Sequence, residues 1–148
     1  MKTVQDILKV KDGEIWSVSA MATVYEALKL MSEKAIGALM VLDEKGEVAG
    51  IISERDYARK VILLGKTSKE TRVSEIMTPV SHMFMVKPEN SLEECMVLMT
   101  QRHIRHLPVF EAGRFIGIIS IGDIVKSIIE DKDTLIAQLN DYISGKYI

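Results

Sequence analysis

The chain has 148 residues, of which 47% are hydrophobic and 27% are charged, a composition typical of a folded protein. This length fits one ordinary domain, or two small domains that share a core because neither buries enough surface alone. The net charge of −2 argues against nucleic-acid binding, because it provides no broad positive field to neutralise a phosphate backbone.

The chain begins with M-K-T-V-Q-D-I-L-K-V, in which charged and hydrophobic side chains alternate without a continuous hydrophobic stretch. This segment predicts neither a signal peptide nor a membrane span, and we expect a cytoplasmic protein that does not bind membranes. Its pattern V-Q-D-I-L returns as V-S-E-I-M at residues 73–77, where a short helix is expected to stop before Pro79.

An internal repeat is the main feature of the sequence, because residues 16–62 align with residues 84–129. The tetrapeptide G-I-I-S occurs at residues 50–53 and again, unchanged, at residues 117–120. A polar linker between the copies predicts a first repeat over residues 1–72, including the N-terminal segment, and a second repeat over 73–148, including a C-terminal helix.

Each copy predicts the element order β-α-β-β-α, which places the chain in the mixed α/β (α+β) class. The first strands are expected around residues 16–18 and 84–86. The helices that follow have Thr23 and Ser91 as N-caps, with Glu26 and Glu94 as capping-box partners. The next two hydrophobic runs are joined by D-E-K-G in one copy and E-A-G-R in the other, which predicts hairpins.

The closing helices are expected over residues 54–64 and 121–130, with Ser53 and Ser120 as their N-caps. The hydrophobic residues of 134–143 recur at helical spacing, which predicts a separate amphipathic helix at the C-terminus. So many hydrophobic faces on a short chain favour a homodimer.

The segment G-I-I-S-x-x-D places a serine hydroxyl, free backbone N–H groups and an aspartate at each closing-helix start. A helix start attracts phosphate, and the carboxylate of Asp56 or Asp123 can accept both hydroxyls of a ribose. The alternative is that Ser53 and Ser120 only cap the helices and the aspartates complement the helix dipole. Recurrence of the segment in both copies, together with the family resemblance given below, favours the ligand interpretation.

Arg55 directly precedes Asp56, where its guanidinium could bind a phosphate through two hydrogen bonds. Gly122 occupies the matching position in the second copy, so the two sites are not equivalent. A solvated surface arginine is the alternative interpretation.

The element order, the duplication and the two G-I-I-S-x-x-D segments resemble the CBS domain family, named for cystathionine β-synthase. With R-H-I-R-H-L-P-V and the linker G-K-T-S-K-E-T-R-V-S-E-I-M-T, the chain resembles stand-alone two-repeat members of the family. The resemblance implies two repeats packed sheet to sheet with pseudo-twofold symmetry. It also implies two clefts that bind AMP, ADP, ATP, NAD or S-adenosylmethionine, and we expect AMP first, with ATP or NAD as alternatives.

The resemblance also implies which residues line each cleft. In the cleft of Ser120, Gly122 and Asp123, the residues in question are Lys11, Trp16, Ile36, Gly37 and Ala38. In the cleft of Ser53, Arg55 and Asp56, they are Met77, Thr78, Phe84, Ile104, Arg105 and His106. Most of these hydrophobic residues are expected in the core whether or not a ligand binds.

No motif of an enzyme or of a metal site stands out in the sequence. Cys95 lies on the hydrophobic stripe of a predicted helix, which favours core packing over catalysis. The histidines near Arg102 and Arg105 lack further ligands at metal-binding spacing. We therefore expect a signal-transduction module that requires no cofactor, catalyses nothing and regulates an unknown protein. The alternatives are a dimeric scaffold without a physiological ligand and, less favoured, a nucleotide-processing enzyme.

Overall fold

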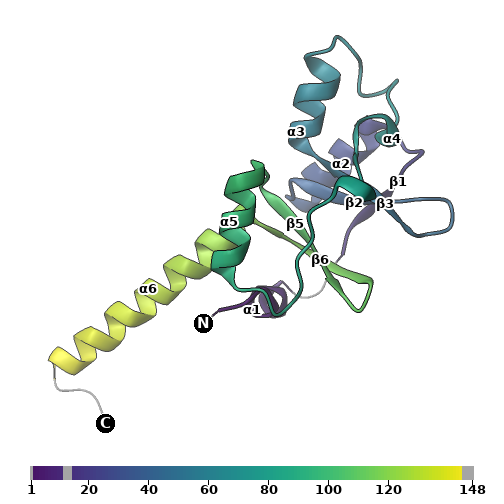
Figure 1. The fold of residues 1–148 in the computed structure, drawn as a ribbon. Helices are drawn as coiled ribbons and strands as arrows, with labels where there is room; N and C mark the ends of the chain where they lie inside the picture. Colours follow the sequence, from purple (N-terminus) through teal and green to yellow (C-terminus); the bar gives the residue numbers. More distant parts are fainter. Residues whose placement is uncertain (1, 12–14, 145–148) are drawn as a thin grey trace. The chain divides into compact units, whose positions relative to one another are not determined.

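The computed structural model describes residues 2–11 and 15–144, without the side chain of Tyr142. Its contacts divide the chain into two compact units (Figure 1). The first-repeat unit is Glu14–Met85, and the second-repeat unit combines Met1–Gly13 with Val86–Ile148. The N-terminal segment therefore packs with the second repeat and not with the repeat that follows it in the chain.

The first-repeat unit is built on a four-stranded sheet with the order β1-β2-β3-β4. β1 runs parallel to β2, and the remaining neighbours are antiparallel. Gly46, with φ +78°, closes the β2-β3 hairpin as the D-E-K-G motif predicts. The elements are β1 (Ser17–Ser19), α2 (Val24–Lys34), β2 (Ala38–Leu42), β3 (Val48–Ser53), α3 (Glu54–Tyr57), a π-helical turn (Ala58–Ile62), α4 (Val73–Ile76), β4 (Thr78–Pro79) and a 3-10 turn (Val80–His82).

The second-repeat unit has the same plan around an antiparallel hairpin of β5 and β6. Ala112 and Gly113 both have positive φ at its turn, a conformation that suits a two-residue hairpin loop. The elements are α1 (Val4–Val10), α5 (Leu92–Arg102), β5 (His106–Glu111), β6 (Arg114–Ser120) and α6 (Ile121–Ile143). The tandem mixed α/β repeat is thus confirmed.

The segments that precede the two repeats are exchanged. Thr3, before α1, bridges Ser91 at the start of α5, while Arg72, before α4, bridges Thr23 at the start of α2. The backbone N–H of Val4 donates to the carbonyl of Asn90, and the N–H of Val73 donates to that of Ala22. Each repeat is therefore completed by the segment that leads into the other one.

Each unit has its own hydrophobic core. The N-terminal helix contributes Val4 and Ile7 to the core of the second-repeat unit, where Ile7 is 6% exposed. Cys95 is fully buried there and confirms its prediction as a core residue. In the first-repeat unit, Val73 and Ile76 of α4 occupy the corresponding place.

The capping residues act largely as predicted. The hydroxyls of Thr23 and Ser91 accept hydrogen bonds from the backbone N–H of Glu26 and Glu94, respectively. The C-caps of α2 and α5 are Ala35 and His103, both in the left-handed conformation that often terminates helices.

The expected strand at residues 84–86 is reduced to one parallel bridge between Val86 and Val109. The N–H of Val86 donates to the carbonyl of Pro108, and the N–H of Phe110 donates to the carbonyl of Val86. The next bond of a parallel ladder would need an N–H at position 108. Because proline has none, the ladder cannot continue toward Phe84.

The closing helices differ from their predicted bounds. The first is α-helical only over Glu54–Tyr57 and continues as a π-helical turn to Ile62. The second runs without a break over Ile121–Ile143, so the separate helix expected at 134–143 is part of α6. No glycine or proline lies between Glu130 and Thr134 to stop it. Helix α4 ends at Ile76, and β4 follows.

We predict that Ile7→Ala costs about 2–5 kcal/mol in free energy of unfolding, because it empties a core position filled by the N-terminal helix. Val10→Ala is the matched control, since Val10 lies on the same helix but is 73% exposed. Urea denaturation followed by circular dichroism measures both. Equal, small effects would contradict the packing of α1 into this core.

Candidate functional site

Both closing helices start directly at the end of a strand, so the predicted Ser and Asp lie at a β-to-α junction. Ser53 ends β3 and precedes α3, while Ser120 ends β6 and precedes α6. At the first junction the N–H of Glu54 donates to the carbonyl of Gly37. At the second, the N–H of Ile121 donates to the carbonyl of Arg105. The two copies therefore build their helix starts in the same way.

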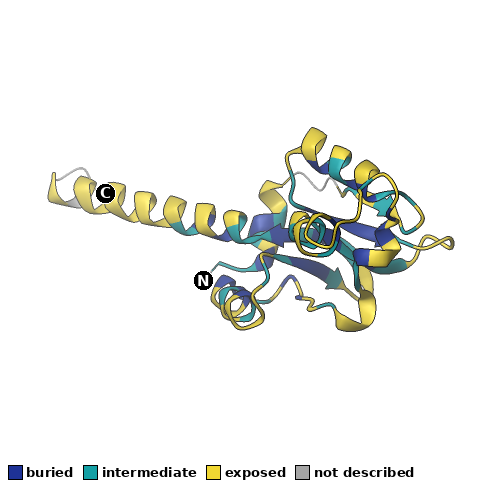
Figure 2. Ribbon diagram, turned by 90° about the horizontal axis from the view of Figure 1, so that it is seen from above, coloured by how far each residue is buried: buried dark blue, intermediate teal, exposed yellow. Residues whose placement is uncertain are grey.

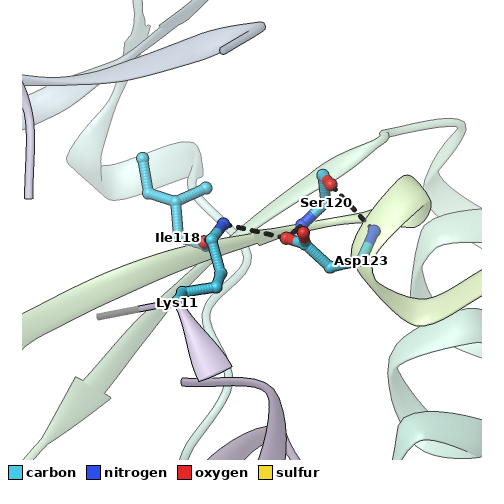
Figure 3. Close-up of polar contacts among 4 residues, drawn as sticks. All are labelled: Lys11, Ile118, Ser120 and Asp123. Carbon is cyan, nitrogen blue, oxygen red and sulfur yellow. Dashed lines mark hydrogen bonds and ion pairs between the residues drawn. The ribbon is translucent and has the colours of Figure 1, made fainter. Parts of the chain in front are cut away.

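Asp123 is held by the backbone of its own helix start and by a distant lysine (Figure 3). Its Oδ2 accepts hydrogen bonds from the N–H of Ser120 at 2.8 Å and from Lys11 Nζ at 2.9 Å. Its own N–H donates to Ser120 Oγ at 3.1 Å. All these side-chain bonds fall on Oδ2, so Oδ1 is the oxygen that can accept a hydrogen bond from a ligand hydroxyl.

Lys11 connects the N-terminal helix to this junction. It is the C-cap of α1, and its ammonium also donates to the carbonyl of Ile118 at 2.8 Å. Burial raises the pKa of Asp123, but the hydrogen bonds from Lys11 and Ser120 outweigh that effect, and the pKa is lowered overall. Asp123 is therefore ionised at neutral pH.

The corresponding junction in the first-repeat unit uses a lysine from its own helix. Asp56 Oδ2 accepts hydrogen bonds from the N–H of Ser53 at 2.9 Å and from its hydroxyl at 3.2 Å. Lys60 Nζ lies 3.4 Å from Asp56 Oδ1 and donates to the carbonyl of Ile76 at 3.0 Å. The sequence prediction missed Lys60, although its spacing of four residues from Asp56 on a helix was a usable signal.

Two matched glycines explain how the exchanged segments approach these strands. A Cβ built on Gly50 would overlap the carbonyl oxygen of Thr78, and one built on Gly117 would lie 2.9 Å from Leu8 Cδ2. Met77 is the C-cap of α4, as Lys11 is the C-cap of α1. Glycine is therefore required at position 50, where backbone blocks a side chain, whereas at position 117 the flexible Leu8 side chain can shift. The two repeats differ at the cap, with Lys in one and Met in the other.

The predicted site residues are divided between the two units. Lys11, Ile104, Arg105, His106, Ser120, Gly122 and Asp123 belong to the second-repeat unit; Trp16, Ile36, Gly37, Ala38, Ser53, Arg55, Asp56, Met77, Thr78 and Phe84 belong to the first-repeat unit. Within their own units, Ala38 pairs with Ser53 across β2 and β3, and His106 pairs with Ser120 across β5 and β6.

Trp16 and His106 each lie beside a positive charge. Lys34 Nζ lies 4.0 Å from the centre of the Trp16 ring, a cation-π contact. Burial lowers the pKa of His106, and the charge of Lys11 lowers it further. His106 is therefore neutral at pH 7.

Catalytic and metal-site signals are weak in the part of the chain that the structure describes. Burial raises the pKa of the Cys95 thiol to about 11, so Cys95 is a poor nucleophile at neutral pH. Among the described side chains, no group of three or more His, Cys, Asp or Glu residues could hold a metal ion. No described helix is both long enough and hydrophobic enough to span a bilayer.

We predict that Lys11→Met raises the pKa of His106, because it removes the lysine charge that disfavours protonation of the imidazole. NMR titration of the His106 ring signals measures this pKa. Lys9→Met is the matched control, because Lys9 is an exposed lysine of the same helix and should leave the pKa unchanged. A His106 pKa that stays the same or falls in Lys11→Met would refute this placement of Lys11.

Comparisons with known proteins agree on one family. The family model of the CBS domain matches residues 4–62 and 73–130. The chain is 40% identical to the mitochondrial CBS domain-containing protein CBSX3 of Arabidopsis thaliana, covering 98% of this chain and 73% of that protein. It is 32% identical to the CBS domain-containing protein YhcV of Bacillus subtilis, covering 84% of each.

A solved structure extends this likeness to the fold. A protein with CBS domains from Burkholderia ambifaria MC40-6, named for signal transduction, matches with a TM-score of 0.82 and 52% identity, covering 88% of this chain and 96% of that one. Membership of one family explains both the duplicated β-α-β-β-α plan and the matched Ser and Asp at the two helix starts. The chain belongs to the CBS domain family.

Proposed function

We propose that this protein is a regulatory module that binds an adenine nucleotide and catalyses no reaction. AMP is the first candidate ligand, with ATP and NAD as alternatives. One observation carries the proposal: a serine, an aspartate and a lysine beside the aspartate come together at the helix start of both repeats, although the lysine comes from a different segment in each. Capping alone accounts for the serine and the aspartate, but it needs no lysine.

The chemistry of this arrangement suits a nucleoside phosphate. The backbone N–H groups of a helix start, together with the ammonium of Lys11 or Lys60, favour a negatively charged phosphate group. The carboxylate of Asp123 or Asp56 provides acceptors for the ribose hydroxyls. In this proposal the phosphate of the ligand pairs with the lysine, and its ribose hydroxyls donate hydrogen bonds to the aspartate.

The adenine ring is assigned to the hydrophobic and backbone surface that family resemblance implies. In the proposed cleft of Asp123 this surface includes Trp16 and residues 36–38. In that of Asp56 it includes residues 104–106, Met77, Thr78 and Phe84.

Regulation is the role that fits a nucleotide site without catalytic groups. The relatives are CBS-domain proteins, and one is named for signal transduction. We propose a homodimer that changes its interaction with another protein when the nucleotide binds, a coupling that need amount to only a few kcal/mol. A scaffold that never binds a ligand is the competing function.

The ligand test is thermal unfolding in the presence of AMP, ADP, ATP, NAD or S-adenosylmethionine at millimolar concentration. A ligand present at about 100 times its Kd should stabilise the protein by about 2.7 kcal/mol, which gives a clear rise in Tm. Chromatography of the same samples should show unaltered nucleotide. If none of the compounds raises the Tm, the scaffold function is favoured instead; turnover would favour an enzyme.

We further predict opposite effects of two substitutions at the matched positions of the helix starts. Arg55→Ala should weaken AMP binding about tenfold or more, since it removes a charge-assisted hydrogen bond to phosphate. Gly122→Arg should strengthen binding at the other site, because a Cβ there meets Ser120 Oγ only at 3.6 Å, an ordinary contact distance.

Calorimetric titration with AMP measures both affinities and the number of sites. Adenosine is the control ligand, because neither substitution should change its binding when the arginine contacts only the phosphate. If both variants bind AMP as tightly as the wild type does, the prediction that an arginine at these positions contacts the phosphate is wrong.

A further inference from the structure

Apart from an ion pair between Lys2 and Asp131, the C-terminal half of α6 packs against no described residue of the second-repeat unit. Ile124 and Ser127 are buried, but every residue from Ile129 to Ser144 whose side chain the structure describes is exposed. Figure 2 shows this part of the helix exposed on all sides as it leaves the body of its unit. An isolated helix of this length is only marginally stable in water, so a covering partner is expected.

Exposed hydrophobic residues line one face of this helix. Val125 and Ile129 begin the stripe, and Ile136, Leu139 and Ile143 continue it, with exposed fractions between 44% and 80%. Lys132 fills the gap between Ile129 and Ile136, so that the stripe positions follow one another at alternating spacings of four and three residues. This is the spacing of a two-helix seam, and a continuous exposed stripe of this kind marks an interface.

The charges of the helix argue against a lipid surface as its partner. The polar face carries Glu130, Asp131, Asp133 and Asp141, whereas helices that bind membrane surfaces carry lysine and arginine there. Anionic lipid headgroups would be repelled.

Resting on the homodimer of the proposed function, we propose that α6 pairs antiparallel with α6 of a second copy of this chain. With Thr134 at the centre, Ile129 lies opposite the partner's Leu139, and Val125 lies opposite the partner's Ile143. This alignment covers the whole stripe, because its spacing reads the same in both directions. The helix of a second copy is therefore a matching surface along its full length.

Lys132 selects the antiparallel direction. In a parallel pair in register, Lys132 would face the partner's Lys132 within the seam, and the two charges would repel. In the antiparallel pair it faces the partner's Ile136, where its methylene stem packs and its ammonium reaches solvent.

Spin labels at position 144 test the direction of the pair. In Ser144→Cys, two labels should be roughly 30 Å apart, because each lies ten residues from the centre at about 1.5 Å per residue. Cys95 is fully buried and should stay unlabelled in the folded protein. A separation of about 10 Å would show a parallel pair, and the lack of a defined separation in a dimer would show unpaired tails. Either result overturns the proposal.

Substitutions on the stripe test whether this face forms the contact. Ile136→Glu combined with Leu139→Glu should raise the dimer dissociation constant at least about a hundredfold, measured by sedimentation equilibrium. The matched control is Ala137→Glu with Gln138→Glu, which adds the same charge to exposed positions of the same helix away from the stripe.

Circular dichroism confirms that both variants fold, which is expected because the changed residues lie outside the core. Equal dissociation constants for the two variants would overturn the proposal. So would a wild-type chain that stays monomeric at micromolar concentration. Both readouts are made without nucleotide, so failure of the helix pair is distinguished from failure of nucleotide binding, which the ligand titrations measure separately.

Discussion

The burial of the N-terminal helix in the core of the second repeat is the contact on which the Asp123 site depends. Val4 and Ile7 anchor α1, and Lys11 follows directly as its C-cap. Anchoring brings the Lys11 ammonium to Asp123, although the two residues are far apart in the sequence. The lowered pKa values of Asp123 and His106 both depend in part on this lysine. Core packing and site electrostatics therefore share one cause.

The same plan gives two sites of different character. Asp123 receives its lysine from a separate segment, whereas Asp56 receives Lys60 from the next turn of its own helix. Arg55 adds a guanidinium at one helix start, and Gly122 leaves that position without a side chain at the other. Lys11 therefore connects Asp123 to the segment that carries α1. We propose that the two sites therefore respond differently to the same class of ligand.

Local features could be predicted from the sequence because local chemistry determines them. Thr23 and Ser91 cap their helices, Gly46 and Gly113 close the hairpins, and the repeat of G-I-I-S-x-x-D located both junctions. Which distant segments pack together could not be predicted from such local features. The pattern shared by α1 and α4 showed that they correspond, but not which repeat each one completes. The loss of the strand near Phe84 depends on Pro108 of a neighbouring strand, which only the pairing register reveals.

The central claim is that both β-to-α junctions bind an adenine nucleotide. Titration of the ¹⁵N-labelled chain with AMP, followed by NMR of the backbone amides, tests it directly. The account predicts saturable shifts at residues 53–56 and 120–123, with little change at Gly46 and Gly113 in the hairpin turns at the other ends of the strands. Amides at both junctions that do not move at millimolar AMP, or shifts confined to other regions, would contradict it.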